Sequence, residues 1–202
     1  MLTDAQIERY ARHILLREVG GVGQERLLRA RVALVGLGGA SMWAAAWLAL
    51  AGVGRLVLRD GRPVEPGDPL PLLGASDVGR PRDRALAEAL PAFNPDVSTS
   101  FDPDERVDLV LLSEGRGGDE NTLLLRWGRG VVLGWGPAIC QKCLEKTQGP
   151  ALPEEAALAG SLAASALLRR LLGLEERTAA TFVLSGGEPA ACEHAPSDPS
   201  VV

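Results

Sequence analysis

Residues 31–60 read RVALVGLGGASMWAAAWLALAGVGRLVLRD, and this stretch decides the fold. The run at about 31–36 is typical of a strand, the Ala-rich run at about 40–51 of a helix, and RLVLRD at 55–60 of a second strand. The 23 residues between Arg31 and Arg55 carry no charge, and apolar stretches above about 18 residues are candidates for membrane spans. Glycines break the stretch early, however, and its helical part is too short to cross a bilayer core of ~30 Å. We therefore interpret it as a buried strand, a tight turn and a buried helix.

The turn between the first strand and the helix contains Gly36, Gly38 and Gly39. In a dinucleotide-type turn the first glycine permits a tight bend, and the second lets a phosphate approach the backbone at the start of the helix. Ser41 stands where such a turn has its third glycine, and Asp60 ends the next strand, where a carboxylate accepts ribose hydroxyls. This combination predicts a nucleotide site. The alternative is a turn that only connects two elements, with Asp60 as a strand-end cap.

Strands and helices alternate along the rest of the chain, which predicts an α/β fold whose sheet is parallel in its first half. The patterns predict helices at 4–16, 23–30, 82–90, 119–127 and 154–172, and strands at 97–101, 107–113, 131–136 and 178–185. A loop rich in Pro and Gly covers 61–81. We expect one domain over 1–185 and a C-terminal tail over 186–202, which has no apolar period.

Composition narrows the class of protein. The chain has 202 residues, of which 46% are hydrophobic and 23% charged, and this balance is ordinary for a folded domain. Its net charge of −5 does not favour a nucleic-acid partner. The polar N-terminus is not a secretory signal, and the odd number of three cysteines is unlike a disulfide scaffold. We therefore expect a cytoplasmic protein without a membrane partner.

The N-terminal third resembles the ThiF/MoeB/HesA family, the bacterial relatives of ubiquitin-activating enzymes. The resemblance is carried by Arg9, Tyr10, Arg12, Ile14, Leu15, Leu16, Gly21, Gln24, Gly36, Gly38 and Gly39. It implies a Rossmann-like three-layer fold of the ThiF/MoeB type and a dimer that binds ATP. It also implies adenylation of the C-terminal glycine of a ubiquitin-like sulfur-carrier protein. Dehydrogenases that bind NAD(P) share the glycine turn but not the preceding helix, so an NAD(P)-binding protein is a weaker alternative.

Several positions depart from the residues that the family uses for catalysis. Arg82 stands at the position of the catalytic Lys, and Arg cannot freely replace a Lys point charge. Arg62 replaces an acidic residue two positions after Asp60. The resemblance further places Asp68, Pro71 and Leu112 where the family has a phosphate-contacting Asn, a phosphate-contacting Arg and a metal-binding Asp. These changes predict a degenerate member with residual ATP binding at most. The alternative is an active adenylyltransferase that uses Arg82.

Arg12 occupies the position from which the family reaches into the ATP site of its dimer partner, as an arginine finger does. This position predicts a chain that pairs with itself or with a competent homologue and lends Arg12 to the partner's site. The alternative is a helix face that is simply solvated.

The cysteines predict a structural zinc site. Cys140 and Cys143 have metal-ligand spacing and resemble the family's first zinc pair, and Cys192 with His194 lies where the family has its second pair. Three thiolates and one imidazole would form a tetrahedral site. The alternatives are a vestigial site with free thiols and, less favoured, a redox dithiol.

Overall fold

The computed structural model describes residues 1–68, 70–114, 118–128, 131–136 and 152–174, together with the backbone of Phe182–Ser185 and Glu188–Ala191. Within these ranges the helices are α1 (Asp4–Arg9), α2 (Ala11–Ile14), α3 (Gly20–Arg29), α4 (Gly39–Ala51), α5 (Arg82–Ala89) and α7 (Pro153–Leu172). The strands are β1 (Arg31–Val35), β2 (Arg55–Arg59), β3 (Ser98–Ser100), β4 (Leu109–Leu112), β5 (Thr122–Trp127), β6 (Val131–Trp135), β7 (Phe182–Ser185) and β8 (Glu188–Ala191).

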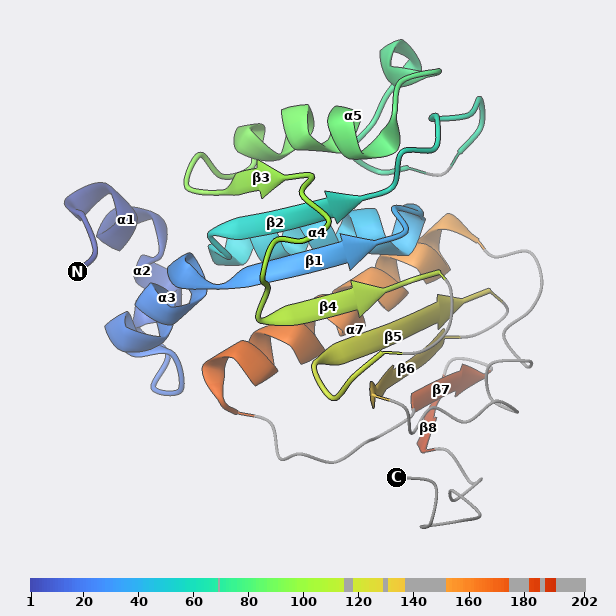
Figure 1. Cartoon of the computed structure of the whole chain (residues 1–202). Helices are drawn as coiled ribbons and strands as arrows, with labels where there is room; N and C mark the ends of the chain where they lie inside the picture. Colours follow the sequence, from blue (N-terminus) through green and yellow to red (C-terminus); the bar gives the residue numbers. More distant parts are fainter. Residues whose placement is uncertain are drawn as a thin grey trace.

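The strands form one sheet in the order β3-β2-β1-β4-β5-β6-β7-β8. Pairs from β3 to β5 are parallel, and those from β5 to β8 are antiparallel. Val32 in β1 lies between Leu56 of β2 and Leu109 of β4, so β1 is central. The prediction of an α/β fold with a sheet parallel in its first half is confirmed. Figure 1 shows α4 and α7 together on one face of this sheet.

Helices α4 and α7 pack closely because small residues line their contact. A Cβ added at Gly160 in α7 would lie 2.3 Å from the carbonyl oxygen of Ala40 and 2.5 Å from Cβ of Trp43. Most of α4 is buried, which explains its lack of charge: the helix packs beside α7 on one face of the sheet. Among the described helices, none combines the length and the apolar character that a membrane crossing requires.

The N-terminal helices are held by a buried polar network. The predicted helix over 4–16 is divided at Tyr10, whose side chain is 2% exposed. Its hydroxyl donates to Asp96 at 2.9 Å and accepts from Nδ2 of Asn94 at 2.7 Å, while Asn94 also donates to the carbonyl of Ala49. Burial raises the pKa of Tyr10 to about 12. Gln24, also fully buried, donates to Ala51, so the network attaches these helices to the end of α4.

The predicted helix at 119–127 is wrong, because these residues form strand β5. Strand β5 pairs with β4 on one side and with β6 on the other, and its leucines are buried, as in a strand inside a sheet. A short apolar run fits a buried helix and a buried strand equally well, so only the neighbouring strands decide between them. The backbone of Glu188–Ala191 adds strand β8 within the segment for which no element was predicted.

Candidate functional site

The candidate site lies where the parallel strands end, at the carboxyl edge of the sheet (Figure 1). Gly36 has φ +80°, a left-handed conformation that glycine adopts without steric cost. Gly38 is the N-cap of α4, and a Cβ added there would meet no atom within 4 Å. The first amides of α4 have no intrahelical acceptor, and the helix dipole is positive at this end. The turn thus offers an open backbone surface suited to a phosphate.

Asp60 connects this turn to the end of β2. Its carboxylate accepts from the Leu37 amide at 2.7 Å, and from the amide, Nε and Nη2 of Arg62 at 3.1, 2.9 and 2.6 Å. Burial favours the neutral acid, but the hydrogen bonds from Arg62 and Leu37 outweigh it and hold the pKa of Asp60 below its usual value. Both carboxylate oxygens therefore already have donors from within the chain.

Arg62 also bonds to Glu114, which follows β4 and is the neighbour of Asp60 at this edge. The two carboxylates raise the pKa of Arg62 above its usual value, with the hydrogen bond to Asp60 as the largest cause. Glu114 extends over the turn, since a Cβ added at Gly36 would lie 2.8 Å from its Cγ. The residues at the phosphate turn fit a nucleotide, whereas the carboxylate that would hold the ribose is already engaged.

Ser41 joins the start of α4 to the end of β4. Its side chain is buried, and its hydroxyl forms a hydrogen bond with the hydroxyl of Ser113. Small Ser41 therefore fits between the helix and the sheet at the position of the third glycine. The predicted residues Gly36, Gly38, Gly39, Ser41 and Asp60 all lie at this one edge.

Arg82, at the start of α5, joins the same edge through the backbone, because its amide donates to the carbonyl of Arg62 at 2.9 Å. Its side chain is 11% exposed and donates to Asp68 at 2.5 Å and to the carbonyl of Pro63 at 3.3 Å. Arg82 and Asp68 are the positions at which the family resemblance implies a Lys and an Asn. The two replacements thus meet in one ion pair.

Glu114 was not predicted as a site residue. The available signal was its place directly after the strand run LVLLS, at the carboxyl end of a predicted strand. The carboxyl ends of parallel strands meet at one edge of a sheet, and only β1 separates β4 from β2, so a long side chain after β4 comes near Asp60.

Arg12 does not lie at this site. It belongs to α2, at the edge where β1 begins (Figure 1), and its side chain is exposed. No hydrogen bond or ion pair joins it to another residue in the described part of the chain. The predicted zinc ligands Cys140, Cys143, Cys192 and His194 lie outside the described residues, so this site stays a prediction. Within the described ranges, no group of three or more His, Cys, Asp or Glu side chains is placed to hold a metal.

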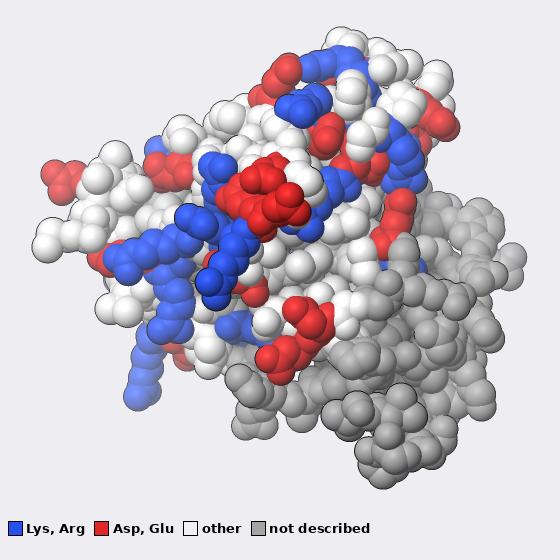
Figure 2. Space-filling view, in the orientation of Figure 1, with Lys and Arg blue, Asp and Glu red and all other residues white. Residues whose placement is uncertain are grey.

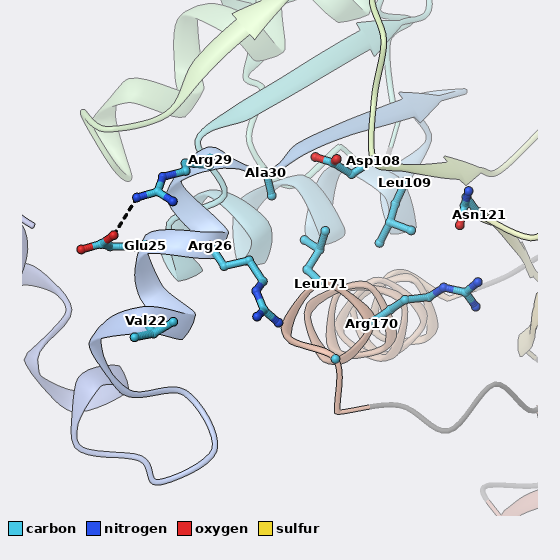
Figure 3. Close-up of a pocket in the computed structure, with 11 residues that line it drawn as sticks. Val22, Glu25, Arg26, Arg29, Ala30, Asp108, Leu109, Asn121, Arg170 and Leu171 are labelled. Atoms are coloured by element: carbon cyan, nitrogen blue, oxygen red, sulfur yellow. Dashed lines mark hydrogen bonds and ion pairs between the residues drawn. The ribbon is translucent and has the colours of Figure 1, made fainter. Parts of the chain in front are cut away.

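A hollow of about 680 Å³ lies at the opposite edge, between α3 and the end of α7 (Figure 3). Its arginines already have partners: Arg26 donates to a carbonyl of α7, Arg29 pairs with Glu25, and Arg170 donates to the carbonyl of Glu120. Figure 2 shows basic side chains gathered at the left of this face, next to a group of acidic side chains. The carboxyl edge therefore remains the better candidate site.

Sequence comparisons identify relatives of the first half of the chain. A model described as the ThiF family matches residues 10–108. The chain is 43% identical over 99 residues to the SAMP-activating enzyme E1 of Haloferax volcanii, covering 48% of this chain and 37% of that protein. It is 38% identical over 98 residues to the sulfur carrier protein ThiS adenylyltransferase of Escherichia coli, covering 48% and 39%. The matched segment thus spans well under half the length of these relatives.

Solved structures extend the similarity of the fold to most of the chain. PaaA is 21% identical with a TM-score of 0.75, covering 96% of this chain and 84% of that one. Escherichia coli MccB is 16% identical with a TM-score of 0.72, covering 91% and 68%. At these identities the structures show a shared fold alone. The glycine turn, Asp60 and the network around Tyr10 all lie within residues 10–108, and this segment of the chain is a ThiF family segment.

Proposed function

We propose that this chain is a non-catalytic half of an activating-enzyme dimer. In this role it docks in the cytoplasm on a ThiF-family homologue that adenylates a ubiquitin-like sulfur carrier. Two relatives are named as adenylyltransferases of sulfur-carrier proteins, and MccB, which shares the fold, has been solved with ATP. The observation that carries the proposal is the ion pair between Arg82 and Asp68.

This ion pair removes a charge that nucleotidyl transfer needs. Transfer is accelerated by fixed positive groups directed at the phosphate oxygens on which charge develops. The guanidinium of Arg82 is mostly buried and is directed at the carboxylate of Asp68 and the carbonyl of Pro63. Its charge is therefore largely neutralised within the chain, which supports a loss of autonomous adenylation.

The position of Arg12 supports a role toward a second subunit. It lies at the amino edge of the sheet, whereas the glycine turn of the same chain lies at the carboxyl edge (Figure 1). Because Arg12 is exposed and has no partner in the described part of the chain, it is available to the site of a docked homologue. An arginine supplied in this way stabilises negative charge in the transition state.

Exposed apolar side chains support docking near Arg12. They comprise Leu15, Leu16, Trp47 and Leu50, which are 84%, 51%, 43% and 43% exposed. Trp47 and Leu50 belong to α4 and line a groove of about 450 Å³ between α4 and α7. Large apolar side chains grouped on one surface are typical of protein interfaces. The groove is lined by α4, α7 and His13 of α2, so it adjoins the helix that carries Arg12.

The test is ATP–pyrophosphate exchange with the purified chain alone, with a competent homologue, and with both, each in the presence of the carrier. We expect no exchange from the chain alone and faster exchange when it joins the homologue. Arg12→Ala should lower the stimulated rate by about tenfold or more. The free energy of unfolding should change by less than about 0.5 kcal/mol, because the side chain is exposed.

Arg17→Ala is the matched control, since the Arg17 side chain is also exposed on the N-terminal segment and forms no hydrogen bond or ion pair with the described residues. Exchange by the chain alone would contradict the proposal and favour an active adenylyltransferase. Equal rates for Arg12→Ala and Arg17→Ala would contradict the role of Arg12. Binding of NAD(P) in preference to ATP would favour the oxidoreductase alternative.

A further inference from the structure

The side chain of Arg62 lies at the place where a nucleotide ribose would meet the chain. Asp60 is the carboxylate at the end of β2, and in a dinucleotide-type site this group accepts ribose hydroxyls. Here Nε and Nη2 of Arg62 donate to its two oxygens at 2.9 and 2.6 Å, and the Leu37 amide is a further donor. A ribose hydroxyl could bond to Asp60 only if it displaced this guanidinium.

Glu114 holds Arg62 from the other side. It bonds to Nη2 of Arg62 and extends over Gly36, where an added Cβ would lie 2.8 Å from its Cγ. The three side chains Asp60, Arg62 and Glu114 thus form a strap from the end of β2 to the end of β4. The strap crosses the turn on the side of Gly36 and leaves Gly38 open.

We propose that Arg62 is a built-in competitor for the ribose of a nucleotide, so that the site admits phosphate groups but excludes the nucleoside part. The inference rests on the nucleotide-type site of the proposed function. Asp60 is 3% exposed, so the ion pair is strengthened by burial, whereas Arg62 is 49% exposed and has room to move outward. Removal of the guanidinium therefore frees Asp60 without a change in the glycine turn.

The experiment measures equilibrium binding of two probes by calorimetry, Mg·ATP and Mg·tripolyphosphate, to the full chain. The second probe has the phosphates without the ribose. We expect Arg62→Ala to tighten ATP binding by about tenfold, since one charge-assisted contact to Asp60 becomes available. Tripolyphosphate should bind no better than before, because removal of a positive charge cannot attract an anion.

Arg55→Ala is the matched control. Arg55 begins the same strand β2, is 38% exposed, and forms a comparable two-bond pair with Glu105 at 2.6 and 3.2 Å, but lies at the opposite edge. It should leave the affinity for both probes unchanged. Glu114→Gln is a second route, because it loosens Arg62 without removing it, and a smaller gain in ATP affinity is expected.

Unchanged or weaker ATP binding in both Arg62→Ala and Glu114→Gln would overturn the inference, and so would an equal gain for tripolyphosphate. Absence of ATP binding from every variant would overturn it as well. Binding is measured without a partner or carrier, so such a failure leaves the role of Arg12 untouched. Failure of the exchange experiment with the homologue likewise leaves the binding result standing.

Discussion

The two edges of the parallel sheet use buried polar residues in different ways. At the amino edge, Tyr10 and Asn94 bond to each other and to the end of α4, so their polar atoms hold the N-terminal helices in place. At the carboxyl edge, Asp60 and Asp68 bond to arginines that stand where the family resemblance implies other residues. The first set serves the fold. The second set consists of charged groups that could bind a ligand but form ion pairs with one another. The fold can therefore be kept while the charged side chains at the site pair with other side chains of the same chain.

The largest effect on stability should come from disrupting the Tyr10 network at the amino edge. Tyr10→Ala removes a side chain that is 2% exposed, and we expect the free energy of unfolding to fall by about 3–5 kcal/mol. Tyr10→Phe keeps the ring and removes one hydroxyl, so it should cost about 1 kcal/mol. Urea titrations of both variants measure the difference. A loss below about 1 kcal/mol in Tyr10→Ala would show that the network is not essential to the fold.

The dependence of stability on alkaline pH reports the amino edge alone, through the titration of Tyr10. The pKa of Tyr10 is raised to about 12 in the folded chain, so its stabilising contribution is complete below pH ~10 and is lost as the pH rises through 12. We expect a loss of about 2–3 kcal/mol over this range, and a much smaller one in Tyr10→Phe. Tyr10 is the only tyrosine in the sequence, so phenolate absorbance reports its titration directly.

The acid limb, which is the change in the free energy of unfolding as the pH falls below neutral, reports Asp60 instead. Its pKa is lowered in the folded chain, so its contribution is present above the unfolded value near ~4 and is lost as the pH falls through the folded value. Asp60→Asn should therefore flatten the acid limb and leave the alkaline limb as in the wild type. Equal alkaline losses in the wild type and Tyr10→Phe, or an acid limb unchanged by Asp60→Asn, would contradict this assignment.

A smaller effect is expected from the pair of Arg82 and Asp68. Asp68→Ala leaves a guanidinium that is 11% exposed without its carboxylate, and should lower the free energy of unfolding by about 1.5 kcal/mol. The double variant Asp68→Ala/Arg82→Met should recover much of this loss, because no charge is then left unpaired. A double-mutant cycle by urea titration measures the coupling. Strictly additive losses would show that the two side chains do not depend on each other.

The sequence predicted the elements around the glycine turn better than it predicted strand β5. The alternation around 31–60 placed β1, α4 and β2 correctly, because the glycines, the Ala-rich run and the β-branched run are local signals. The same reasoning failed for Thr122–Trp127, where a run of leucines fits either element and the sheet on both sides makes it a strand. The roles of Arg12 and of the predicted zinc ligands remain predictions.

The sequence by itself determined the family motif, the order of the elements in the first half of the sheet, and the positions that depart from the expected catalytic residues. Only the tertiary structure decided what those departures do. That Glu114 reaches the local pair of Arg62 and Asp60, and that Arg82 reaches Asp68, depends on side chains brought together from separate segments of the chain. Periodicity records which residues are buried along one element, whereas an ion pair depends on the distance between elements that are far apart in the sequence.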